Sequence, residues 1–161
     1  MSGSPHEAPQ RARARSAVQA AGVFLIFIVV GPAIAALLAI GILPLFGITS
    51  LAGDINGFIH GIGTLMAVSY VMGGLQMAAI GLFAALWRLV MRKPTISLLL
   101  ILAVSLVVAA VAIIIFAQPF SMPAPDPTIV AAVLVLHVGA AIGTALIANA
   151  FLRRQQTRAL A

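Results

Sequence analysis

Residues 87–117 read WRLVMRKPTISLLLILAVSLVVAAVAIIIFA, and this stretch decides the fold. Its apolar part, 95–117, consists almost wholly of Leu, Ile, Val and Ala. The basic residues before it are Arg88, Arg92 and Lys93. An apolar run of about 20 residues is long enough to cross the hydrocarbon core of a bilayer as a helix. The stretch therefore predicts a membrane-spanning helix that begins beside a cluster of positive charges.

Three further apolar runs have the length of a membrane span: 17–43, 64–87 and 128–152. The six other basic residues flank the first and last of these runs: Arg11, Arg13, Arg15, Arg153, Arg154 and Arg158. Four spans put all nine basic residues on one side, while Asp54 and Asp126 fall on the other. Because short cytoplasmic loops hold an excess of Lys and Arg, the sequence predicts an all-α, integral membrane four-helix bundle with a cytoplasmic N-terminus and C-terminus.

The segments outside the spans divide the chain further. Residues 1–16 are polar and rich in Pro, Ala and Arg, so we expect a disordered cytoplasmic tail there. The transmembrane domain then covers 17–152, and 153–161 form a second cytoplasmic tail. The glycine-rich segment 47–63 is expected to be an external loop with a short interfacial stretch.

A cleaved signal peptide is the alternative interpretation of residues 1–35. A basic start, an apolar core at 23–30 and a Gly31-Pro32 break precede the small residues Ala33 to Ala35. The apolar run, however, continues to Leu43, which favours a retained span. Proline in a helix interior removes a backbone hydrogen bond, so we expect a kink at this break.

Composition excludes several classes of protein. The 161 residues are 63% hydrophobic and only 7% charged, whereas about a quarter of residues are charged in soluble domains. The absence of cysteine excludes disulfides, thiolate metal sites and palmitoylation. Topology accounts for the formal net charge of +6, so we expect no nucleic acid as a partner. We expect the basic clusters to contact anionic lipid headgroups at the cytoplasmic face.

Small residues at helical spacing predict where helices pack. Gly139 and Gly143 lie one turn apart, Gly31 lies in the first span, and Gly74 and Gly81 lie in the second. Glycines at this spacing let a neighbouring backbone approach closely, and van der Waals contact drives helix association in lipid. We expect packing within the monomer; contact in a homo-oligomer and contact with a partner membrane protein are the alternatives.

Polar residues inside the spans are the candidates for function. His137 is the only His, Lys, Arg, Asp or Glu well inside the predicted hydrocarbon region, and Tyr70, Gln76 and Asn149 are the other strong hydrogen-bonding groups. Counted from the outer ends of their spans, Tyr70 and His137 differ in depth by about 5 Å, so a hydrogen bond between them is geometrically feasible. Tyr70, Gln76 and His137 form the candidate polar site, interpreted first as structural and alternatively as proton- or ligand-handling.

No catalytic, cofactor or metal site is predicted. His6 lies in the tail and His60 outside the second span, so neither shares a depth with His137 as a haem would require. These histidines also lack ligand spacing with Asp54 or Asp126. The spans contain no carboxylate and no Ser with a base at helical spacing. We therefore expect a protein that is not an enzyme.

Three short patterns suggest a family. They are GPAI at 31–34, YVMGG at 70–74 and GL at 81–82, and they resemble small, uncharacterised bacterial inner-membrane proteins with four spans. The resemblance implies a multi-pass protein of the bacterial inner (plasma) membrane. Such proteins have no assigned activity, so no functional residue carries over.

Two functions are compatible with these features. The first is a non-enzymatic structural or accessory subunit, favoured by the weak polarity of the spans. The alternative is a small oligomeric transporter or channel whose path is lined by Tyr70, Gln76, His137 and Asn149. The two functions differ in where these polar groups find hydrogen-bond partners. In a transporter or channel they would converge on a hydrated path, whereas in a structural subunit each would bond to nearby protein groups.

Overall fold

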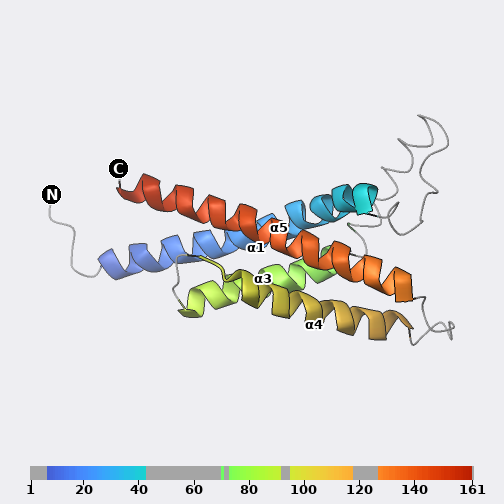
Figure 1. Ribbon diagram of the computed structural model, residues 1–161. Helices are drawn as coiled ribbons and strands as arrows, with labels where there is room; N and C mark the ends of the chain where they lie inside the picture. The colour runs from blue at the N-terminus through green and yellow to red at the C-terminus, as the bar shows by residue number, and fades with distance from the viewer. Residues whose placement is uncertain (1–6, 43–69, 71–72, 92–94, 118–126, 161) are drawn as a thin grey trace.

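A computed structural model describes residues 7–42, 70, 73–91, 95–117 and 127–160 of the chain (Figure 1). These residues form helices and contain no strand, which confirms the all-α prediction for the described part. The helices are α1 (Glu7–Ile42), α3 (Gly74–Met91), α4 (Leu98–Ala117) and α5 (Pro127–Leu160).

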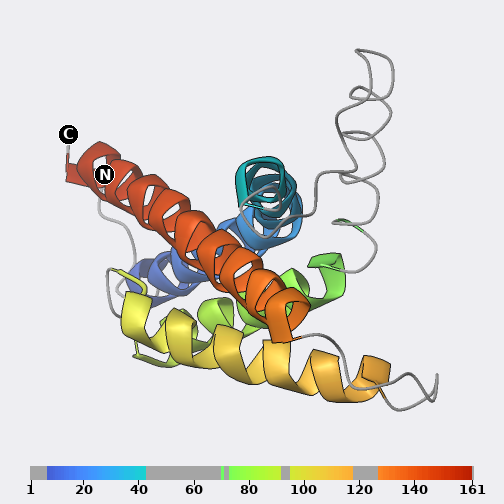
Figure 2. The same cartoon turned by 45° about the vertical axis from the view of Figure 1, so that its right-hand side comes forward.

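The four helices run in alternating directions, so that the start of α1 and the end of α5 lie at the same end of the molecule (Figure 1). The most extensive packing joins α1 to α3 and to α5, and α4 packs on α5 and α3. Each helix thus contacts two neighbours in a ring. Figure 2 shows α5 crossing obliquely over the helices beneath it.

The first and last helices, α1 and α5, are longer than the sequence predicts. The expected disordered tail at 1–16 is wrong for residues 7–16, because α1 begins at Glu7. Similarly, α5 continues past residue 152 to Leu160. Both extensions are rich in Ala, Arg and Gln, which are strong helix formers, and each residue added to an existing helix gains a backbone hydrogen bond.

Three helices contain stretches long and apolar enough to cross a membrane: Ala14–Ile42, Gly74–Met91 and Val130–Thr157. In α4 the apolar stretch within the described side chains is Leu98–Ala112, which is shorter than these three. The predicted external segment 47–63 lies outside the described residues.

Apolar side chains lie both inside and outside this arrangement of helices. Phe27, Met77 and Ile80 are fully buried where α1 meets α3, together with alanines of α5. Leu75 and Leu99 are among many large apolar side chains that stay exposed. The interior is therefore no more apolar than much of the outer surface.

Candidate functional site

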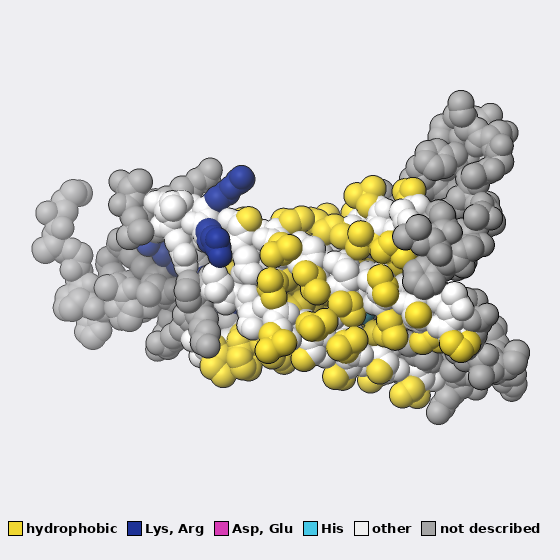
Figure 3. All heavy atoms as spheres, in the orientation of Figure 1, with side chains coloured by type: hydrophobic (Ala, Val, Ile, Leu, Met, Phe, Trp, Pro, Cys, Tyr) yellow, Lys and Arg dark blue, Asp and Glu magenta, His cyan; other side chains and the backbone are white. Residues whose placement is uncertain are grey.

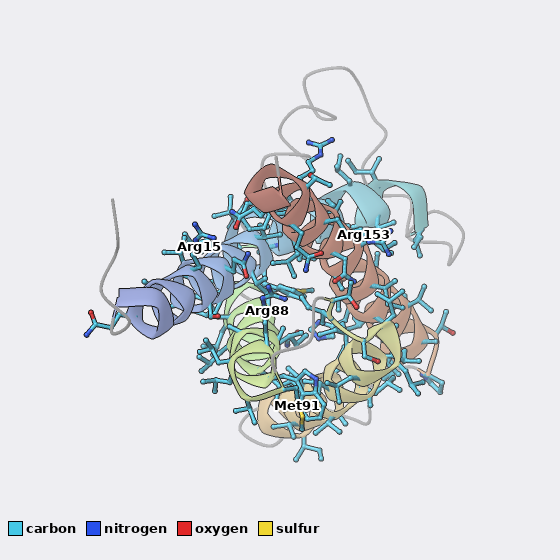
Figure 4. The ribbon with its side chains drawn as sticks, turned by 90° about the vertical axis from the view of Figure 1, so that its left-hand side faces the viewer. Arg15, Arg88, Met91 and Arg153 are labelled. Carbon is cyan, nitrogen blue, oxygen red and sulfur yellow. The ribbon has the colours of Figure 1, made fainter. Side chains whose placement is uncertain are left out.

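The described basic side chains gather at one end of the molecule (Figure 3). Figure 4 views this end and labels Arg15 on α1, Arg88 on α3 and Arg153 on α5. Arg15 and Arg153 are exposed, whereas Arg88 is half-buried. Three helices thus contribute a cation to the same end, as the clustering in the sequence predicts.

Arg88 is held where α1 and α3 meet. Its Nη2 donates a hydrogen bond of 2.5 Å to Oε1 of Gln19. A hydrogen bond from a charged donor is stronger than one between neutral groups. This contact links the basic end of α3 to α1.

Tyr70 is the first polar residue of the predicted site, and it binds α1. Its hydroxyl donates a hydrogen bond of 2.6 Å to the backbone carbonyl of Val29. Val29 lies three residues before the buried Pro32, in the turn that a proline ring disturbs. The phenol proton therefore goes to the backbone of a neighbouring helix, and the hydrogen bond between Tyr70 and His137 that the sequence made geometrically feasible is not formed among the described residues.

Asn149 makes a two-point contact at the start of α4. Its Oδ1 accepts from the Ile96 amide at 2.7 Å, and its Nδ2 donates to the Ile96 carbonyl at 3.0 Å. The first amides of a helix have no partner within the helix, and residues just before it need partners as well. Asn149 thereby ties the basic end of α5 to the beginning of α4.

His137 lies inside the bundle and is only 6% exposed. Its Nε2 atom is buried and has no hydrogen-bond partner among the described residues. Gln76, the third member of the predicted site, is half-buried near the start of α3. Of the predicted polar residues, Tyr70 and Asn149 thus bond to separate helices, and only His137 is left with a buried atom that lacks a partner in the described part.

Two buried hydroxyls were not predicted. Ser105 and Thr144 are fully buried, and each donates to a carbonyl of its own helix: Ser105 to Leu102 at 2.9 Å and Thr144 to Ala140 at 2.7 Å. Thr144 follows His137 by seven residues, which is two helical turns. That spacing is the sequence signal that places both side chains on one face of α5.

Glycines on α1 and α3 receive large side chains of the other helix. A Cβ added to Gly81 would lie 2.6 Å from the Cβ of Phe27, and a Cβ added to Gly31 would lie 2.9 Å from the Cγ of Met77. Both distances are too short for real side chains. α1 and α3 therefore contact each other at two pairs of residues, and each pair consists of a large side chain on one helix and a glycine on the other.

The remaining predicted glycines differ from one another. A Cβ at Gly139 would lie 3.1 Å from Leu38, and one at Gly143 would lie 3.4 Å from Ile34, so both face α1. An added Cβ at Gly74 would meet nothing within 4 Å among the described residues. Gly139 and Gly143 together receive two side chains that lie one turn apart on α1.

The described residues hold no group of three His, Asp or Glu side chains that would suit a metal ion. His6, His60, Asp54 and Asp126 lie outside the described residues.

Comparison with protein-family models, curated proteins and solved structures finds no match for this chain. The fold itself defines the class: an all-α protein with three described helices that are long and apolar enough to cross a membrane. Function must therefore be argued from the polar contacts and the surfaces of these helices.

Proposed function

We propose that this chain is a multi-pass protein of the bacterial inner membrane that acts as a non-enzymatic structural or accessory subunit. The observation that supports this role is that polar side chains of the predicted spans form hydrogen bonds to backbone groups of other segments. Tyr70 bonds to the backbone of α1 at Val29, and Asn149 bonds to the backbone just before α4 at Ile96. Polar groups used in this way hold helices together instead of lining a path.

The outer surface supports insertion in a membrane. Large side chains such as Leu75, Val90 and Leu99 are more than 70% exposed. Each square ångström of apolar surface in water costs about 25 cal/mol, and soluble monomers rarely expose large contiguous apolar patches. In this proposal α4 is the fourth span, and lipid covers these side chains.

The basic end supports the orientation. Cations of three helices share the end that holds the start of α1 and the end of α5 (Figures 1 and 4). Because cytoplasmic loops of membrane proteins carry an excess of Lys and Arg, we propose that this end faces the cytoplasm. Anionic lipid headgroups are its expected partners there, since each nearby Lys or Arg contributes about 1 kcal/mol to such contact.

An accessory subunit requires a partner surface, which is provided by a second copy of the chain or by another membrane protein. The exposed leucines of α3 offer one such surface. Leu75, Leu82, Leu86 and Leu89 are all exposed and recur at seven-, four- and three-residue steps along one side of the helix. We expect part of this side to be covered in the native membrane.

Photo-crosslinking tests the accessory role. A photoreactive residue at the exposed position Leu82 should yield one defined adduct in native membranes, either with a second copy or with another protein. The control is the same residue at Leu152, which is fully buried and should yield no adduct between chains. Purification in a mild detergent should recover the same partner in fixed proportion. A chain that crosslinks only to lipid and purifies alone would contradict the proposal.

A small oligomeric transporter or channel is the second candidate. The buried Nε2 of His137, which lacks a partner in the described part, favours it. Ionisable groups inside membrane proteins usually mark pathways or functional sites. Reconstituted vesicles decide between the two: a proton or ion flux that is lost in His137→Gln supports transport, and vesicles no leakier than protein-free ones support the accessory role.

A further inference from the structure

Three buried polar side chains stand out among the described residues: Ser105, His137 and Thr144. The contact between Asn149 and Ile96 sets the register between α4 and α5, which run in opposite directions. Counting about 1.5 Å per residue from that contact, Thr144 lies about 8 Å, Ser105 about 14 Å and His137 about 18 Å along the bundle. The three residues therefore occupy one zone about 10 Å deep.

Their side chains belong to the inner faces of the two helices. On α5, His137 and Thr144 are spaced like Ala141 and Ala148, both of which are fully buried in the core. On α4, Ser105 lies one turn from the buried residues Ile101 and Ala109. Residues at three-, four- and seven-residue steps share a helix face. Both faces are thus directed into the bundle at this depth.

The three polar groups of this zone differ in the hydrogen bonds that they can still form. The hydroxyls of Ser105 and Thr144 donate their only proton to carbonyls of their own helices. Each hydroxyl oxygen then has acceptor capacity left. His137 Nε2 needs one partner, which is an acceptor or a donor according to the tautomer. A ligand that uses all three groups donates a hydrogen bond to each hydroxyl and meets either form of the imidazole.

We propose that Ser105, His137 and Thr144 bind water between α4 and α5, with Nε2 of His137 as its principal contact. Because the three groups are spread over about 10 Å along the bundle and a hydrogen bond spans about 3 Å, the site takes a short chain of hydrogen-bonded water molecules. Each molecule donates two hydrogen bonds and accepts two, so the chain satisfies both hydroxyl oxygens and either tautomer of His137. Buried waters in proteins typically bond about three otherwise unsatisfied polar groups. The small side chains of Ala140 and Ala141 beside His137 make little steric demand at this depth. The interior of the bundle is therefore hydrated at one level, whichever function the chain has.

Solid-state NMR with selective transfer of magnetisation from water tests this site in the full chain in lipid vesicles. The chain has three histidines, so His6→Gln combined with His60→Gln leaves His137 as its only imidazole. With ¹⁵N-labelled histidine, the signal of Nε2 then belongs to one atom. We expect transfer from water to Nε2 to be as efficient as transfer to exposed side chains at the basic end.

Two substitutions connect the water to the proposed partners. Thr144→Val and Ser105→Ala each remove a hydroxyl with little change in volume, and together they should abolish most of the transfer to Nε2. Thr157→Val is the matched control, since Thr157 is exposed and also bonds to its own helix; it should leave the transfer unchanged.

The result is decisive even where a variant does not fold. If the double variant fails to fold, the two single variants are compared, each with a partial loss expected. A parent chain without transfer from water to Nε2, or a contact from Nε2 to another group of the protein, would overturn the proposal. Transfer that is unchanged in the folded double variant would also overturn it.

Discussion

Phe27 of α1 occupies the space that a side chain at position 81 of α3 would need, since a Cβ at Gly81 would lie 2.6 Å from the Cβ of Phe27. The reverse arrangement lies one turn along both helices, where Met77 of α3 fills the space beside Gly31 of α1. Antiparallel helices can meet in this way only in one register. The pairs therefore specify the alignment of α1 and α3 as well as their closeness.

Gly81→Ala tests this alignment. The added methyl must displace Phe27 or separate the helices, and overpacking of this kind typically costs about 1 to 3 kcal/mol of unfolding free energy. Gly74→Ala is the control, because nothing described lies within 4 Å of its added Cβ; it should be neutral or stabilise by about 0.5 to 1 kcal/mol through helix propensity. Unfolding in detergent measures both. Equal stability of the two variants would show that α1 and α3 do not meet at Gly81.

Gly143→Ile tests the packing of α5 on α1. A single methyl at this position would have ordinary contact with Ile34 at 3.4 Å, but a branched side chain would not fit. We expect Gly143→Ala to be tolerated and Gly143→Ile to lose about 1 to 3 kcal/mol of unfolding free energy. Ile34→Ala should recover part of that loss in the double variant, and a double-mutant cycle measures the recovery. Strictly additive effects would mean that the two positions do not touch.

Tyr70→Phe isolates the hydrogen bond to Val29. The ring is retained and only the hydroxyl is lost, so the expected cost is about 0.5 to 1.5 kcal/mol of unfolding free energy. Trp87 is the only tryptophan of the chain and is kept in the variant, so its intrinsic fluorescence can report unfolding of both proteins. A variant as stable as the parent would indicate that the carbonyl of Val29 is satisfied equally well without Tyr70.

Helical structure and the approximate positions of the helices follow from the sequence because long apolar runs without charged residues favour helices. The apolar run at 95–117 forms α4, Leu98–Ala117, and its crossing of a membrane stays a prediction. Glycine spacing is less informative, since it does not say which side of a helix meets a neighbour. Gly74 and Gly81 lie in the same run, yet among the described residues only a Cβ added at Gly81 would meet a side chain of another helix.

Side-chain partners could not be predicted from depth alone. Counting residues from the outer ends put Tyr70 near His137, but the hydroxyl donates to Val29 beside Pro32 instead. Ser105 and Thr144 escaped attention because a small hydroxyl in an apolar run is usually satisfied by its own helix. Their burial depends on how α4 and α5 pack in the bundle, which no local sequence pattern records.

Asn149→Leu tests the contact between α5 and the start of α4. The apolar side chain leaves the amide and the carbonyl of Ile96 without the partners that Asn149 supplies, at an expected cost of about 1 to 3 kcal/mol. Since the contact lies at the beginning of α4, amide hydrogen exchange should also accelerate at Ile96 and not in the middle of that helix. Thr157→Val, at an exposed position further along α5, is the control and should change neither quantity.

Cysteine labelling tests the orientation and the number of spans together. The chain has no cysteine, so Ser50→Cys, Ser121→Cys and Thr157→Cys each provide one unique thiol. Because cations gather at the end that holds the start of α1 and the end of α5 (Figure 3), a reagent that does not cross membranes should label positions 50 and 121 in intact spheroplasts and spare position 157. Lysed membranes are the control, in which all three positions should react.

The same variants test whether the first helix is retained. Phe27, Gly31 and Ile34 of α1 pack against α3 and α5, so cleavage after residue 35 would remove these contacts from the mature protein. We expect mass spectrometry of the purified chain to find residues 1–35 still attached. Labelling of position 157 from outside would refute the proposed orientation, and protection of position 121 from outside would show that α4 does not cross the membrane.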